Sequence, residues 1–179
     1  NYDGNTDVYV IPAFGGEPHL VTHHPSTDRL LDWSPDGSEL LFASARKSGT
    51  RAFSQLYLVP ANGGLPNKLA VPYGEFGSFS PDGKTLAFTP KDRGFSTWKR
   101  YRGGMAPDIW LFDLVEHTSQ RITNWEGTDS QPMWHGNNVY YMSDAGPAHR
   151  LNIWRWDRGK NKHHQITKFT AYDVKWPSI

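Results

Sequence analysis

The stretch from Lys91 to Arg102 holds the densest group of side chains that could bind a ligand. Its end combines three cations, Lys99, Arg100 and Arg102, with the aromatic ring of Tyr101. Guanidinium groups suit paired contacts with carboxylates, so these cations are candidates to bind peptide carboxylates or an acidic protein surface. The alternative is a structural loop with its aromatic residues packed on a sheet and its cations solvated. Both interpretations stay open from the sequence.

Other residues with reactive groups give weaker indications. Histidines occur in the adjacent pairs His23-His24 and His163-His164. Neighbouring residues in a strand point to opposite faces, so such a pair rarely supplies two ligands to one metal ion. Asp36 and Asp82 belong to a repeated turn, and no nucleophile-elbow motif occurs. We therefore expect no catalytic residue, no metal site and no cofactor in this chain.

Composition limits the classes of partner. The formal net charge is +1, which gives no argument for nucleic acid or membrane binding, and we expect neither. No apolar run approaches the length of a membrane-spanning helix. The chain has no cysteine, which excludes disulfides and thiolate sites but fits a cytoplasmic and a periplasmic protein equally well. The compartment is therefore left open.

A repeated motif indicates which elements position these residues. Trp33-Ser34-Pro35-Asp36-Gly37 precedes an apolar run, as expected for a β-hairpin. Phe79-Ser80-Pro81-Asp82-Gly83 repeats the pattern 46 residues later. Strands with a central aromatic residue recur at spacings of 48, 53 and 44 residues; these residues are Tyr9, Tyr57, Trp110 and Trp154. Four short strands in such a period are typical of a propeller blade.

The repeats predict an all-β fold, a β-propeller of four-stranded antiparallel blades. We expect three complete blades at 29–72, 73–124 and 125–170. Partial blades are expected at both ends, with strands c and d in 1–28 and strand a in 171–179. We interpret the chain as a single partial propeller whose ring continues on both sides. The alternative is that the two end pieces pair and close a four-bladed ring.

Charge is unevenly distributed over the predicted loops. The long loops between strands b and c carry nine cations against two acids, Asp92 and Asp144. The loops between successive blades lean acidic, with Asp28, Glu75, Glu126 and Asp129. Both sets of loops lie on the same side of a propeller. We therefore expect a basic outer ring on that side, and the acidic loops argue against nucleic acid as its ligand.

Two levels of family resemblance are visible. Trp33 to Gly37, followed by Leu41 to Ser44, resembles the repeat of TolB-like propellers. Trp98 to Gly104, followed by Ile109-Trp110, resembles the six-bladed propeller of the tricorn protease family. That second resemblance covers essentially all 179 residues. It implies a large oligomeric peptidase with two propellers and a separate C-terminal part that holds the catalytic serine and histidine.

The resemblance also implies a role for the propeller. In this family the propellers form channels that filter or guide peptides, and two adjacent arginines anchor a peptide C-terminus. The corresponding loop here, 23–31, has a single arginine, Arg29. Arg29 therefore joins Lys99, Arg100 and Arg102 as a candidate for peptide or anion binding.

We thus expect a non-catalytic region of a tricorn-like serine peptidase that shapes a channel to bind or gate peptides. Its expected partners are peptides, other domains of the same protein and further copies in a homo-oligomer. One alternative is a TolB-like propeller that docks a protein partner. Another is a metal-dependent sugar-acid lyase on the same scaffold.

Overall fold

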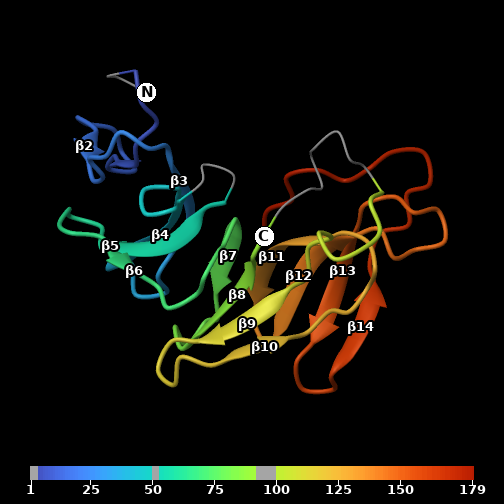
Figure 1. Cartoon of the computed structure of the whole chain (residues 1–179). Coiled ribbons are helices and arrows are strands. Elements are labelled where there is room, and N and C mark those ends of the chain that lie inside the picture. The colour runs from blue at the N-terminus through green and yellow to red at the C-terminus, as the bar shows by residue number, and fades with distance from the viewer. Residues whose placement is uncertain (1–3, 50–52, 92–99) are drawn as a thin grey trace. The chain divides into compact units, whose positions relative to one another are not determined.

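The computed structural model describes residues 4–49, 53–91 and 100–179, and these residues form strands and loops without a helix. The described residues therefore contain no helix that is long and apolar enough to cross a membrane. The chain divides into two compact units, Asn1–Glu75 and Phe76–Ile179, which we describe separately. Figure 1 shows the strands of both units.

The first unit contains a short hairpin and one complete sheet. The hairpin pairs β1 (Tyr9–Val10) with β2 (His19–Leu20). The sheet is antiparallel in chain order and consists of β3 (Asp28–Trp33), β4 (Glu39–Ser44), β5 (Gln55–Pro60) and β6 (Asn67–Lys68).

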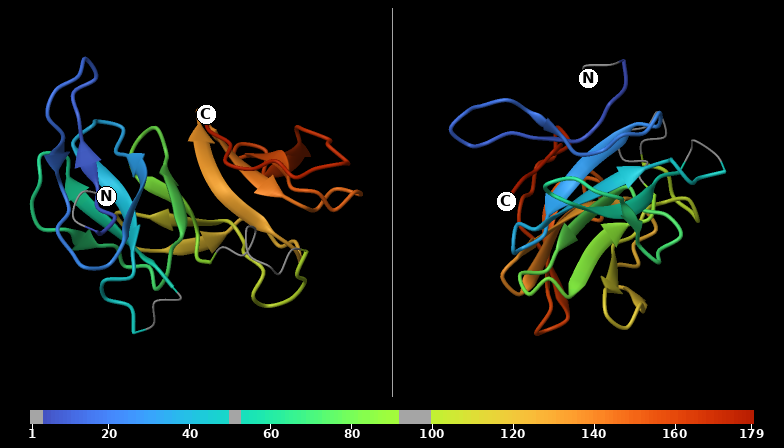
Figure 2. Two further views of the ribbon diagram at one scale, coloured as in Figure 1. Left: turned by 90° about the horizontal axis from the view of Figure 1, so that it is seen from above. Right: turned by 90° about the vertical axis from the view of Figure 1, so that its left-hand side faces the viewer.

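The second unit contains two four-stranded antiparallel sheets. The first consists of β7 (Phe76–Phe79), β8 (Thr85–Thr89), β9 (Trp110–Asp113) and β10 (Ser119–Arg121). The second consists of β11 (Asp129–His135), β12 (Asn138–Ser143), β13 (Asn152–Asp157) and β14 (Lys162–Gln165). Figure 2 shows the strong twist of the strands in the second of these sheets, drawn in orange.

The repeated hairpin has the predicted geometry. In the first copy, the Gly37 N–H donates to the Ser34 carbonyl at 2.8 Å, and Gly37 has a φ of 72° that favours glycine. Asp36 accepts from the Ser34 hydroxyl at 2.6 Å. In the second copy, Asp82 accepts from the Ser80 hydroxyl at 2.6 Å. Both aspartates therefore hold turns, as the repeat predicted.

Each unit has its own core between consecutive sheets. In the first unit, Val8 and Val21 pack with Phe42 and Tyr57. In the second, Ile109 and Ile122 pack with Tyr141, Trp154 and other apolar residues. A buried threonine marks the same place in both cores, since Thr22 accepts from the Val8 N–H and Thr123 from the Ile109 N–H. The sheets therefore repeat in packing as well as in topology.

The predicted all-β propeller class is confirmed, and the described residues form three antiparallel four-stranded sheets preceded in the sequence by a two-stranded hairpin. One predicted strand is absent, because residues 171–179 have an irregular backbone. The Val174 N–H donates to the Leu151 carbonyl at 2.8 Å, but the segment takes part in no strand ladder. The residue limits of the individual blades stay a prediction.

Candidate functional site

Arg102, the last cation of the predicted basic loop, is held by acidic and aromatic residues of the second unit. Its Nη1 lies 2.8 Å from Oδ2 of Asp144, which is buried. Its guanidinium lies 5.1 Å from the centre of the Trp125 ring. Asp144 also accepts from the Trp125 indole N–H at 2.8 Å and from the Thr128 N–H at 2.9 Å. Arg102 therefore joins one loop to the next rather than pointing freely into solvent.

Gly127 makes this cluster sterically possible. A β-carbon at this position would lie 2.4 Å from Arg102 Nη1, 2.4 Å from Asp144 Oδ1 and 2.5 Å from Trp125 Nε1. Separations this short are outside the normal range of non-bonded contacts. A side chain at Gly127 would therefore force the side chains of this cluster to shift.

The other predicted cations have different environments. Arg100 is exposed and has a φ of 58°, while Lys99 lies outside the described residues. Arg29 belongs to the first unit, where its Nη2 lies 3.1 Å from Oε2 of Glu75 and also donates to the Glu75 carbonyl. Its side chain is 39% exposed and lines a cavity of about 270 Å³. Arg29 therefore has an exposed part that a ligand could contact.

The predicted basic ring is partly neutralised by the acidic loops. In the first unit, Arg46 forms an ion pair with Asp28, which is 1% exposed. In the second, Arg102 pairs with Asp144 and lies 4.0 Å from Glu126. The sequence places Asp28 and Glu126 in the acidic loops between blades. It places Asp144 in one of the long loops between strands b and c, as it does the two arginines. A sum of the loop charges therefore overestimates the positive charge that is available to a ligand.

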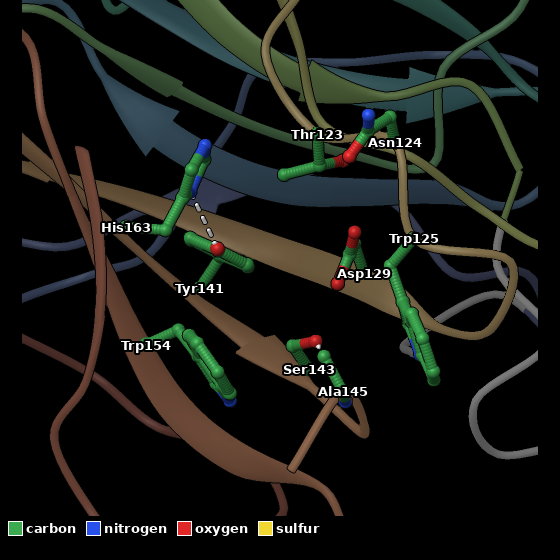
Figure 3. Close-up of a pocket in the computed structure, with 9 residues that line it drawn as sticks. All are labelled: Thr123, Asn124, Trp125, Asp129, Tyr141, Ser143, Ala145, Trp154 and His163. Atoms are coloured by element: carbon green, nitrogen blue, oxygen red, sulfur yellow. Dashed lines mark hydrogen bonds between the residues drawn. The ribbon is translucent and has the colours of Figure 1, made fainter. Parts of the chain in front are cut away.

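The second unit also contains a cavity of about 220 Å³ that sequence reasoning did not identify. Figure 3 shows its lining, which combines aromatic rings with one carboxyl group, that of Asp129. The lining residues are Thr123, Asn124, Trp125, Asp129, Tyr141, Ser143, Ala145, Trp154 and His163. They come from the segment that follows β10, from all four strands of the next sheet, and from the loop after β12.

Burial determines the protonation of this cavity. It raises the pKa of Asp129 to about 7, against hydrogen bonds from Ser143 and Thr123 that lower it. Burial also lowers the pKa of His163, whose Nδ1 lies 2.8 Å from the Tyr141 hydroxyl (Figure 3). At neutral pH the cavity thus holds a partly ionised carboxyl and a neutral imidazole. Such a site can accept a cation or exchange a proton.

The cavity does not resemble a metal centre. Within the described residues no group of three histidine or acidic side chains is close enough to hold a metal ion. His163 bonds Tyr141, and its neighbour His164 lies opposite Arg155 in the sheet. The adjacent histidines thus have separate surroundings.

A family model for the tricorn protease N-terminal β-propeller domain matches residues 1–179. The chain belongs to this family. One relative of the tricorn propeller is "Tricorn protease homolog 1" of Streptomyces coelicolor, 32% identical over 150 residues. That match covers 79% of this chain and 13% of the relative, so the chain spans about an eighth of its length.

Solved structures agree with the fold of this tricorn propeller. A crystal structure of the tricorn protease matches with a TM-score of 0.77 at 21% identity, covering 93% of this chain and 16% of that one. TolB from Acinetobacter baumannii matches with a TM-score of 0.73 at 23% identity, covering 92% of this chain and 38% of that one. At such identities both likenesses concern the fold alone.

Proposed function

We propose that this tricorn propeller is a non-catalytic part of a serine peptidase and shapes a channel that binds or gates peptides. The family match over residues 1–179 carries this proposal. Four of the described carboxylates support it, because Asp36 and Asp82 hold turns, whereas Asp28 and Asp144 pair with arginines. These acids stabilise the scaffold, and the chemistry is assigned to another part of the full-length protein.

Arg100 and Lys99 are the proposed contacts for peptide carboxylates. Arg100 is exposed and follows Lys99 directly, so the two cations are adjacent in the chain. Arg102 has a different role, because Asp144 and Trp125 hold its guanidinium. It anchors the end of the loop from which the other two cations would act. Arg29 is a second proposed contact, through the exposed part of its side chain.

The test is peptide turnover by the full-length protein carrying Lys99→Ala and Arg100→Ala. The substrates are one peptide with a free C-terminal carboxylate and the same peptide amidated. Loss of a charge-assisted hydrogen bond of about 1.5–3 kcal/mol should lower kcat/KM for the free acid by about tenfold or more. The amidated peptide should react as before, since it lacks the carboxylate.

Lys84→Ala with Lys160→Ala is the matched control. It removes the same charge from two exposed lysines in turns at β8 and after β13. If this control lowers turnover equally, the effect is one of net charge and the proposed contact is wrong. If turnover of both peptides is unchanged in the Lys99 and Arg100 variant, a protein-docking role becomes the better account.

We further propose that the propeller contacts other domains of its own chain and that the full-length protein forms a homo-oligomer. The match covers only 13% of the length of the Streptomyces coelicolor relative, which supports contacts with other domains. Mass measurement of the full-length protein in solution tests the second, and a monomeric mass would contradict it.

A further inference from the structure

Two of the sheets contain the same arrangement of side chains at the same place. Asp28 begins β3 and lies opposite Ser44, the last residue of β4. Asp129 begins β11 and lies opposite Ser143, the last residue of β12. An aromatic pair lies two residues before each serine: Phe42 opposite Tyr57 in one sheet, and Tyr141 opposite Trp154 in the other. Each sheet thus has one buried carboxyl group beside two aromatic rings.

In the first sheet an arginine of the chain occupies the space between these groups. Arg46 pairs with Oδ2 of Asp28, and its guanidinium lies 4.9 Å from the Phe42 ring centre and 5.3 Å from that of Tyr57. The Arg46 side chain is only 9% exposed. This sheet therefore shows which group the arrangement accommodates: a flat cation between aromatic rings and a carboxylate.

In the second sheet the residue at the corresponding position is Ala145. Its backbone follows the same course, because the Ala145 N–H donates to the Ser143 hydroxyl at 3.1 Å as the Arg46 N–H does to Ser44 at 3.3 Å. The alanine leaves the cavity of about 220 Å³ beside Asp129, Tyr141 and Trp154. Figure 3 shows the carboxyl group of Asp129 between the rings and the neighbouring loop.

Two polar atoms of this cavity lack a hydrogen bond within the described part of the chain. Oδ1 of Asp129 and Nε1 of Trp154 are both buried and without a partner. An unsatisfied buried polar group costs free energy, and such groups are uncommon in folded proteins. Oδ1 of Asp28 also lacks a partner beside Arg46, so the atom that distinguishes the second sheet is Nε1 of Trp154, which is available to a ligand.

The sheet that lies between these two in the sequence, β7 to β10, shows that the arrangement is not a general property of the blade. Phe76 takes the place of the aspartate and lies opposite Thr89. Ala87 and Leu111 take the place of the aromatic pair. Lys91, at the position of Arg46, lies 3.4 Å from the Met105 sulfur. Without a carboxyl group, the cation at this position is directed elsewhere.

We propose that the cavity lined by Asp129, Tyr141 and Trp154 binds the guanidinium group of an arginine residue in a peptide. Asp129 supplies the counter-charge that Asp28 supplies to Arg46, and the two rings supply the stacking surfaces. The cavity is below the roughly 300 Å³ of a site for a drug-sized ligand and suits a single side chain. The proposal that the cavity binds a guanidinium group is independent of the proposed function. The proposal that this group belongs to a peptide rests on that function.

The surrounding charges set the pH dependence of binding. Asp108 and Asp144 add negative charge near Asp129, while Arg102 is directed to Asp144. His163 is neutral near pH 7 because burial lowers its pKa. A bound guanidinium favours the ionised form of Asp129, so affinity should rise as the pH rises through about 7, the pKa of that carboxyl group.

The test is calorimetric titration of the full-length protein with Nα-acetyl-arginine methylamide and with its citrulline analogue. Citrulline has nearly the same shape without the charge. We expect the arginine probe to bind. The citrulline probe should bind more weakly by a factor of about ten or more, as for loss of a charge-assisted contact. Asp129→Asn should weaken arginine binding by a similar factor and remove its pH dependence.

Ala145→Arg should abolish binding, because the new side chain can follow the course of Arg46 and fill the cavity. Asp82→Asn, which removes a carboxylate from an exposed turn, is the control and should bind as the wild type does. Equal binding of arginine and citrulline, or binding unchanged in both Asp129→Asn and Ala145→Arg, would overturn the proposal.

Should Ala145→Arg not fold, the citrulline comparison and Asp129→Asn still decide the question. The assay measures binding and not turnover, so it is separate from the test of the proposed function. If the turnover test fails and the arginine probe still binds, the guanidinium pocket is retained. Only the proposal that the arginine belongs to a peptide is then removed.

Discussion

Removal of the Arg46 side chain should strongly destabilise the first unit. Its guanidinium neutralises Asp28, which is 1% exposed, and it covers the rings of Phe42 and Tyr57. Oδ1 of Asp28 has no hydrogen-bond partner among the described residues, so the arginine is the main compensation for that charge. Arg46→Met retains most of the side-chain volume and removes the charge.

The expected cost follows from these contacts. Removing one partner of a buried ion pair destabilises a protein by about 3–5 kcal/mol, because the other charge is left uncompensated. The lost stacking on the two rings is part of that change. Asp28→Asn together with Arg46→Met should recover most of the loss, since no buried charge then remains.

Hydrogen exchange of the full-length protein, resolved by peptide, is the appropriate assay, because it reports each segment separately. A loss of 3–5 kcal/mol corresponds to protection of β4 and β5 that is about 10² to 10⁴ times lower. Arg121→Met is the control, since Arg121 is 51% exposed and pairs with Asp108 at 3.3 Å, a surface pair that contributes about 1 kcal/mol or less. If the two substitutions have equal effects, or the double variant is no better than Arg46→Met, the reasoning is refuted.

Three further predictions concern the second unit and use the same assay. Burial raises the pKa of Asp129 to about 7, so the folded unit should lose stability between about pH 4 and pH 7, where the unfolded carboxyl has ionised and the folded one has not. Asp129→Asn removes this loss, so the free energy of unfolding of the variant relative to the wild type should increase by up to about 4 kcal/mol between pH 4 and pH 7; a constant difference would contradict the assignment. Gly127→Ala should cost about 1–3 kcal/mol by displacing the Arg102–Asp144 pair, whereas Gly104→Ala, with open space around it, should not. Arg102→Met should cost less than Arg46→Met, because Asp144 keeps two N–H donors; an equal cost would show that those donors do not compensate the charge.

Much of the scaffold was predictable because its signals are local. The Asp36-Gly37 turn needs only a residue that tolerates positive φ and a short side chain that caps the turn. Alternating apolar residues then indicate strands, and their recurrence indicates blades. The strand predicted at 171–179 is not present in the structure, since residue type alone does not determine whether a segment joins a sheet.

The binding candidates were less predictable, because their surroundings come from distant residues. Arg46 and Asp28 are 18 positions apart, and Arg102 and Asp144 are 42 apart. The charge count identified all four residues as loop residues but could not indicate that they pair. The cavity at Asp129 had one sequence signal: Ser44-Ala45-Arg46 in one repeat corresponds to Ser143-Asp144-Ala145 in another.

By itself, the sequence determined the all-β class, the repeat of four-stranded blades and the family, since turn chemistry and strand alternation act over a few residues. The tertiary structure decided which cations are paired and which buried carboxyl, among the described residues, has no cation beside it. The physical reason is that charge compensation and burial depend on the residues that neighbouring sheets bring together. A single alanine in place of arginine therefore leaves a cavity where the other sheet has a buried ion pair.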